Sequence, residues 1–137
     1  MTDLACAKAA LAGHTLALCR AGECRVSDGR GIAPMMELIA KGVDLAGCSA
    51  ADVVVGKAAA MLFAKCRIAA VYAGTLSRHA QRYLDAAGIP YEYGALTEYI
   101  VNREGTGMCP MEQTVLSEED AERGYLLLRD KLASLHK

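Results

Sequence analysis

Lys57 stands in an almost wholly apolar stretch, and this setting makes it a candidate for binding an anion. The stretch covers residues 49–66 and reads SAADVVVGKAAAMLFAKC, which predicts one long helix with Ser49 as its N-cap and Asp52 at the third position. No residue three, four or seven positions from Lys57 is charged. Its ammonium is therefore expected either to lie beside a cavity with an acidic partner or a bound anion, or to reach water along its aliphatic stem.

Gly56 precedes this lysine and points to a close contact. Glycine costs about 1 kcal/mol relative to alanine inside a helix, so its presence suggests the close approach of a strand, a loop or a ligand. The Gly-Lys pair is not a phosphate-binding P-loop, because the GxxxxGK pattern requires glycine where this chain has Ala51.

A thiol and a carboxylate, Cys109 and Glu112, follow a glycine-containing turn at residues 105–107. Cys109 is a candidate nucleophile, and Glu112 is a candidate general base or a partner for Lys57. No neighbouring residue in the sequence supplies a base for the thiol. These two residues are the candidate catalytic pair.

The sequence gives only weak indications of a nucleotide-binding loop or a metal site. The segment 27–34, SDGRGIAP, is rich in glycine, but its spacing matches no nucleotide-binding fingerprint, so Gly31 is a candidate only for a substrate-contacting loop. The scattered set Cys48, His79 and Cys109 lacks the spacing of a zinc site. We predict no metal site and no cofactor.

The bulk composition narrows the class of protein. The 137 residues are 53% hydrophobic and 23% charged, which predicts one folded domain over residues 1–137. The net charge of −1 offers no electrostatic footprint for nucleic acid or for a membrane surface. No signal peptide or membrane span is recognised, so we expect a cytoplasmic protein with reduced cysteines, Cys19 and Cys24 included.

The predicted elements alternate after an initial hairpin. This alternation favours a three-layer α/β/α domain with helices on both faces of a mixed sheet. The elements are a helix at 3–11, strands at 15–19 and 24–27, a helix at 35–41, the helix at 49–66, a strand at 68–72, a helix from Thr75 or Ser77 to 87, a strand at 90–93 and a last helix after 117–120 that packs on the sheet.

This order of elements resembles the cytidine-deaminase-like fold. Three stretches are similar to one uncharacterised bacterial family within it: GIAP at 31–34, DVVVGKAAA at 52–60 and MCPME at 108–112. Zinc deaminases open one helix with His-Ala-Glu or Cys-Ala-Glu and the next with Pro-Cys-x-x-Cys. This chain has GKAA at 56–59 and TLSRH at 75–79 in those places, so the resemblance implies a domain without zinc-dependent deaminase activity.

The resemblance also implies where a ligand would bind. The fold brings the two helix N-termini together at one end of the sheet, where backbone N–H groups favour an anion. We therefore expect a metal-free domain that binds a small anionic or nucleotide-like ligand and is regulatory or weakly catalytic. Lys57 would pair with its charge, Cys109 and Glu112 would close the pocket, and the remaining candidate ligand-binding residues are Gly31, Ser49, Gly56, Thr75 and Ser77.

Two alternatives remain open. One is an enzyme that uses Cys109 as its nucleophile, with Lys57 or Glu112 assisting. The other is a structural module whose alanine-rich faces pair two copies into a homodimer.

Overall fold

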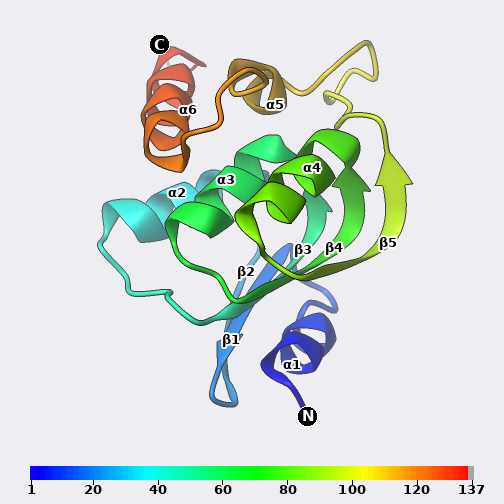
Figure 1. The fold of residues 1–137 in the computed structure, drawn as a ribbon, viewed down its shortest axis with the longest axis vertical. Helices are drawn as coiled ribbons and strands as arrows, with labels where there is room; N and C mark the ends of the chain where they lie inside the picture. Colours follow the sequence, from blue (N-terminus) through cyan, green and yellow to red (C-terminus); the bar gives the residue numbers. More distant parts are fainter. Residues whose placement is uncertain (136–137) are drawn as a thin grey trace.

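The computed structural model describes residues 1–135 and contains a five-stranded mixed sheet flanked by helices (Figure 1). The strand order is β2-β1-β3-β4-β5. Strand β1 is antiparallel to both of its neighbours, and β3, β4 and β5 are parallel to one another. The strands are β1 (Leu16–Arg20), β2 (Glu23–Ser27), β3 (Ser49–Val55), β4 (Ala70–Ser77) and β5 (Tyr91–Thr97).

The predicted hairpin of β1 and β2 is confirmed. Ala21 and Gly22 both have positive φ values, as a two-residue hairpin turn requires. Cys19 pairs with Cys24 across the two strands, and the two residues form a disulfide with a Cα–Cα distance of 4.1 Å. The expectation that these thiols are reduced is therefore wrong for this pair, because the register places them directly opposite each other.

The predicted helix over 49–66 is wrong in its first half. Residues Ser49–Val55 form β3, and helix α3 (Lys57–Lys65) begins only after Gly56. The run of three valines at 53–55 favours a strand, and β3 lies between β1 and β4, where an apolar run without alternation is expected. Ser49 is thus the first residue of a strand rather than a helix cap.

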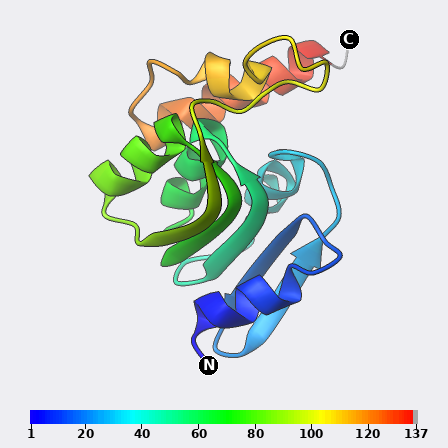
Figure 2. The same cartoon turned by 90° about the vertical axis from the view of Figure 1, so that its right-hand side faces the viewer.

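Helices cover both faces of the sheet. Helix α1 (Asp3–Ala10), capped by the Thr2 hydroxyl, packs on one face against β1, β3 and β4. Figures 1 and 2 show α3 and α4 (Arg78–Ala87) on the other face, and helix α2 (Ala33–Ala40) contacts α3. The predicted α/β class with helices on both faces of a mixed sheet is confirmed.

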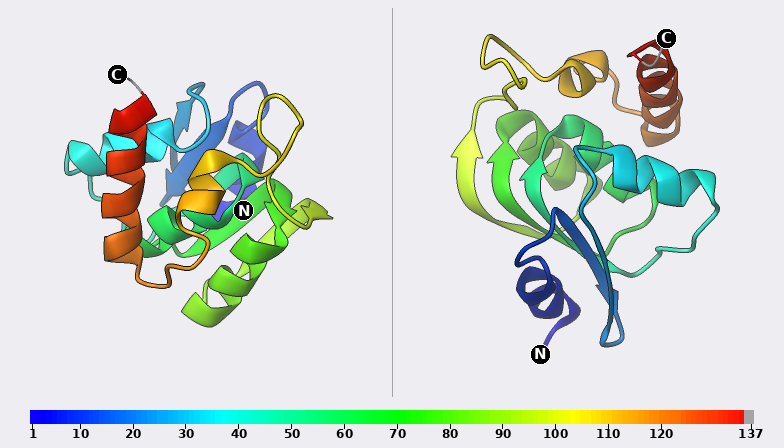
Figure 3. Two further views of the ribbon diagram at one scale, coloured as in Figure 1. Left: turned by 90° about the horizontal axis from the view of Figure 1, so that it is seen from above. Right: turned by 180° about the vertical axis from the view of Figure 1, so that it is seen from behind.

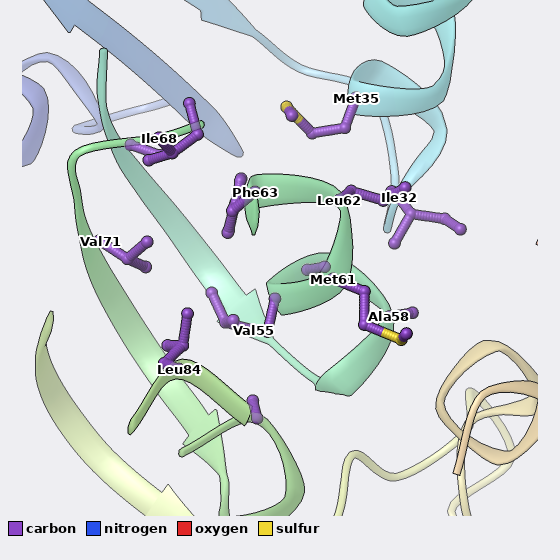
Figure 4. Packing of buried hydrophobic residues seen from close by; sticks show 14 of the residues in the cluster. Ile32, Met35, Val55, Ala58, Met61, Leu62, Phe63, Ile68, Val71 and Leu84 are labelled. Carbon is purple, nitrogen blue, oxygen red and sulfur yellow. The ribbon is translucent and has the colours of Figure 1, made fainter. Parts of the chain in front are cut away.

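Helix α3 forms the centre of the larger core. All of its residues from Lys57 to Phe63 are buried. Figure 4 shows Phe63 and Leu62 between Ile32 and Met35 on one side and Val71 and Leu84 on the other. Helix α3 is thus the element against which α2, α4 and the two helices that follow β5 pack.

Strand β4 is longer than predicted, since it continues through Gly74 and Thr75 to Ser77. Gly74 does not end the strand. A Cβ atom at this position would lie 2.6 Å from the Val53 carbonyl oxygen of β3, so glycine permits the close approach of the two strands. Thr75 therefore lies within a strand, and of the two predicted helix starts only Ser77 is confirmed, as the N-cap of α4.

Two further helices, α5 (Pro110–Thr114) and α6 (Ala121–Leu135), form an outer layer. Figure 3 shows both lying over α3. Helix α6 contacts α3 and α5, with Leu128 fully buried, so the prediction that it packs on the sheet is wrong. A Cβ atom at Gly124 would lie 2.6 Å from the Met61 side chain, which explains how the two helices approach closely. Within residues 1–135, every helix is too short or too polar to cross a membrane.

Candidate functional site

The candidate site lies where two parallel strands end and two helices begin. Val55 of β3 pairs with Leu76 of β4, so the residues that follow them, Gly56 and Ser77, start α3 and α4 side by side. The Ser77 hydroxyl accepts a hydrogen bond from the backbone N–H of Ala80, as an N-cap does. The free N–H groups of both helices therefore face the same end of the sheet.

The Glu112 carboxylate fills the space between these helix starts. Its Oε2 accepts hydrogen bonds from the Lys57 backbone N–H at 2.7 Å and from the Ser77 hydroxyl at 2.5 Å. Its Oε1 accepts the Ile100 backbone N–H at 2.7 Å, and the residue is only 1% exposed. The anion that two helix N-termini favour is thus supplied by the chain itself.

Gly56 is needed for this arrangement. A Cβ atom at position 56 would lie 2.8 Å from Ile100 Cγ1 and 2.9 Å from Glu112 Oε2. The inference that the glycine marks a close approach is confirmed, and the approaching groups are the Glu112 carboxylate and the loop that follows β5.

The Lys57 side chain points into a different space. Its Nζ donates hydrogen bonds to the Leu116 carbonyl oxygen and to Glu119 Oε1, both at 2.9 Å. The residue is 4% exposed and lines a cavity of about 260 Å³. Of the two alternatives for this lysine, burial beside a cavity with an acidic partner is confirmed. We call this space the Lys57 cavity; its lining residues are Lys57, His79, Arg82, Tyr83, Leu116 and Glu119.

A larger pocket of about 530 Å³ lies between the end of β3, the start of α2 and the loop before α5. A smaller recess of about 90 Å³ adjoins it, because both are lined by Gly31, Val54 and Cys109. We call the two together the Asp52 pocket. Its polar lining residues are Thr15, Arg30, Asp52, Asn102, Arg103 and Cys109 in the larger part and Glu112 in the recess.

Asp52 is the unusual group in this pocket. It is 8% exposed, and its Oδ1 accepts one hydrogen bond, from the Val54 backbone N–H at 3.2 Å. Burial raises its pKa to about 7, against the opposing effect of the Val54 and Val53 backbone N–H groups. In the described part of the chain, no cationic side chain lies within ion-pair distance of this carboxyl group.

The structure brings some of the predicted site residues together and separates others. Gly31, Gly56, Cys109 and Glu112 all line the Asp52 pocket. Ser77 reaches it only through Glu112, Lys57 faces its own cavity, Thr75 lies inside β4, and Ser49 lies at the opposite end of β3.

Five polar residues of the pocket were not among the predicted site residues: Thr15, Arg30, Asp52, Asn102 and Arg103. Arg30 and Arg103 occur in loops, where arginine carries no local signal. Asp52 did give a local signal, since it is a single acid within an apolar run. That signal was interpreted as part of a helix N-cap and therefore not as a pocket residue. A buried, unpaired acid in a cleft is the stronger indication of a functional site.

The residues at the two helix starts do not fit a zinc ion. Gly56 and Lys57 begin α3, and Ser77 begins α4, so Glu112 is the only carboxylate between them. Across residues 1–135, no group of three or more His, Cys, Asp or Glu side chains is placed to hold a metal ion.

Comparisons with known proteins agree with the observed fold. Residues 7–132 match the family described as TM1506, domain of unknown function (DUF1893). A solved structure of a DUF1893 family protein (TM1506) from Thermotoga maritima is similar with a TM-score of 0.85 and 24% sequence identity, covering 96% of this chain and 91% of that chain. No curated protein matches the sequence. Because the family match spans most of the chain, the protein belongs to the DUF1893 family.

Proposed function

We propose that the protein binds a small anionic or nucleotide-like ligand in the Asp52 pocket. The observation that carries this proposal is a buried carboxyl group that has no cationic partner within residues 1–135 and lines a pocket that also carries two arginines. A buried polar group left without hydrogen-bond partners costs about 1–3 kcal/mol, and a charged group costs more. Such a group is retained more readily where a ligand completes its hydrogen bonds.

The lining of the pocket favours a particular kind of ligand. Arg30 and Arg103 are exposed, and neither takes part in an ion pair within residues 1–135. Their guanidinium groups suit a phosphate or carboxylate, which they bind through paired N–H donors. Asp52 suits a group that donates hydrogen bonds. Ile32, Val54 and Met111 supply apolar contacts between these two ends.

The proposal includes a cytidine-deaminase-like arrangement of the fold. The strand order with an antiparallel β1, and the adjacent starts of α3 and α4, support it. In this view Glu112 stands between the two helix N-termini where zinc deaminases place a metal site. The ligand would then bind beside this carboxylate, in the Asp52 pocket, without zinc chemistry.

A thermal-shift experiment with a panel of nucleotides and phosphorylated metabolites tests this proposal. A ligand present at 100 times its Kd stabilises the folded state by about 2.7 kcal/mol. We expect at least one compound to stabilise the unmodified protein, with the shift lost in Arg30→Met and Asp52→Asn. The matched controls are Arg129→Met and Asp44→Asn, which alter exposed residues outside the pocket. Equal shifts in all four variants would contradict the proposal.

A second candidate function is catalysis with Cys109 as the nucleophile. The observation in its favour is that Cys109 lines the same pocket as Asp52, whose pKa of about 7 suits a general base near neutral pH. In this candidate Asp52 accepts the thiol proton, and the arginines hold the substrate's anionic group.

A further inference from the structure

We infer that the Lys57 cavity is a separate binding site for a small oxyanion such as inorganic phosphate. The cavity shares no lining residue with the Asp52 pocket, so the inference does not depend on the function proposed for that pocket. Two cationic side chains, Lys57 and Arg82, and two further polar side chains, His79 and Tyr83, line it.

The Lys57 ammonium is buried and incompletely satisfied. An ammonium group has three N–H donors. The protein atoms of residues 1–135 accept two of them, at the Leu116 carbonyl and at Glu119 Oε1. A buried cation requires strong compensation, and the third donor is available to an acceptor within the cavity.

Glu119 competes only weakly with an incoming anion for the Lys57 ammonium. Its side chain is 75% exposed while that of Lys57 is 5% exposed, so the only carboxylate that pairs with the buried ammonium within residues 1–135 is a solvated surface group. Because the Glu119 carboxylate is already largely solvated, it can turn to water and leave the ammonium to another anion at a smaller cost than a buried carboxylate would. Asp120 follows Glu119 in the sequence and adds a second nearby negative charge that an incoming anion must overcome.

The α4 side chains that line the cavity supply further hydrogen-bond donors. Arg82 Nη2 lies 3.0 Å from His79 Nδ1, and because arginine can only donate, Nδ1 is the acceptor and the imidazole carries its hydrogen on Nε2. The remaining N–H groups of Arg82 are available to a ligand. Burial, followed by the charges of Glu119 and Asp120, raises the pKa of Tyr83, so its hydroxyl also keeps its hydrogen for donation.

The size of the cavity suits an oxyanion together with water. Its volume is about 260 Å³. One water molecule occupies about 30 Å³ in the liquid, so the cavity exceeds the space of a single bridging water several times. A tetrahedral oxyanion presents acceptors in several directions at once, which matches donors that come from α3 on one side and α4 on the other.

Isothermal titration calorimetry with inorganic phosphate tests the inference. Chloride keeps the ionic strength constant, so that general screening does not differ between samples. Arg82→Gln should weaken phosphate binding. Glu119→Gln should tighten it by up to about fivefold, because the competing carboxylate is removed. Lys57→Met should abolish it; if that variant fails to fold, the other two substitutions still decide.

The chain provides matched controls for the changes at Lys57 and Glu119. Lys65 pairs with Glu122 between α3 and α6 at 2.6 Å, and neither residue lines the cavity. Lys65→Met and Glu122→Gln alter the net charge by the same amounts and should leave phosphate binding unchanged. Arg30→Met should also leave it unchanged, which separates this site from the Asp52 pocket. Equal affinities in Glu119→Gln and Glu122→Gln, or unaltered binding in Arg82→Gln, would show an adventitious ion only and overturn the inference.

Discussion

The carboxylate of Glu112 accepts a hydrogen bond from the backbone N–H of Lys57 at 2.7 Å, across 55 positions of the chain. The same oxygen accepts the Ser77 hydroxyl, and the other oxygen accepts the Ile100 N–H. One side chain thereby joins the starts of α3 and α4 to the loop that lines the Asp52 pocket. The position of this loop depends on Glu112, and so does the shape of the recess beside Gly56.

The first prediction concerns Glu112→Gln. The glutamine amide keeps one acceptor but replaces the other with a donor, which would face a backbone N–H or the Ser77 hydroxyl. Buried groups left unsatisfied cost about 1–3 kcal/mol each, more when the hydrogen bonds involve a charge. We expect the free energy of unfolding, measured with urea, to fall by about 2–4 kcal/mol.

A matched control for this prediction is Glu37→Gln. Glu37 is an exposed residue of α2 that pairs with Lys41 at 2.8 Å, and such pairs contribute little. Its free energy of unfolding should change by less than about 0.5 kcal/mol. If Glu112→Gln changed stability by no more than this control, the proposed role of the carboxylate in joining the two helices would be wrong.

The second prediction concerns Gly56→Ala. The φ of Gly56 is −96°, which any residue adopts, so the effect tests space rather than backbone strain. The new Cβ atom would lie within 3 Å of Ile100 Cγ1 and Glu112 Oε2. We expect a loss of about 1–3 kcal/mol in the free energy of unfolding, typical of an overpacked site. Gly107→Ala is the control, since nothing lies within 4 Å of a Cβ atom there; equal effects would refute the steric explanation.

The sequence predicted the parts of the fold that depend on local signals. The hairpin turn at Ala21 and Gly22 and the Ser77 cap of α4 follow from residues close in sequence. The boundary between β3 and α3 could not be predicted in this way, because a short apolar run without regular alternation has the same composition in a strand and in a helix. The contact of Glu112 with the start of α3 has no local signal, since it forms only when α5 packs over α3.

The third prediction concerns the pH dependence of stability through Asp52. Its pKa is raised to about 7 in the folded protein from a value of 3.8. Between these two values the folded state binds more protons than the unfolded state, so this group makes stability fall as pH rises from about 4 to 7. The maximum effect is about 4 kcal/mol, from 1.36 kcal/mol for each unit of pKa difference.

Asp52→Asn removes this titration. Urea unfolding at pH 5 and at pH 8 should therefore show the variant gaining stability relative to the unmodified protein at the higher pH. Asp44→Asn, at an exposed residue 4.0 Å from Arg20, should show no such gain. Parallel pH profiles for Asp52→Asn and the unmodified protein would indicate that the carboxyl group ionises in the folded state as readily as in water.

The fourth prediction concerns the accessibility of Cys109. This half-buried thiol lines the Asp52 pocket, whereas burial raises the pKa values of Cys48 and Cys66 and lowers their thiolate fractions. Iodoacetamide at pH 7.5 should therefore label Cys109 faster than Cys48 and Cys66, measured by peptide mass spectrometry. The nucleophile candidate requires in addition that Asp52→Asn slows labelling of Cys109 and leaves that of Cys6 unchanged, because Cys109 lines the same pocket as this carboxyl group and Cys6 does not. Uniform slow labelling of all four free cysteines would remove the catalytic candidate and leave ligand binding as the proposed function of the pocket.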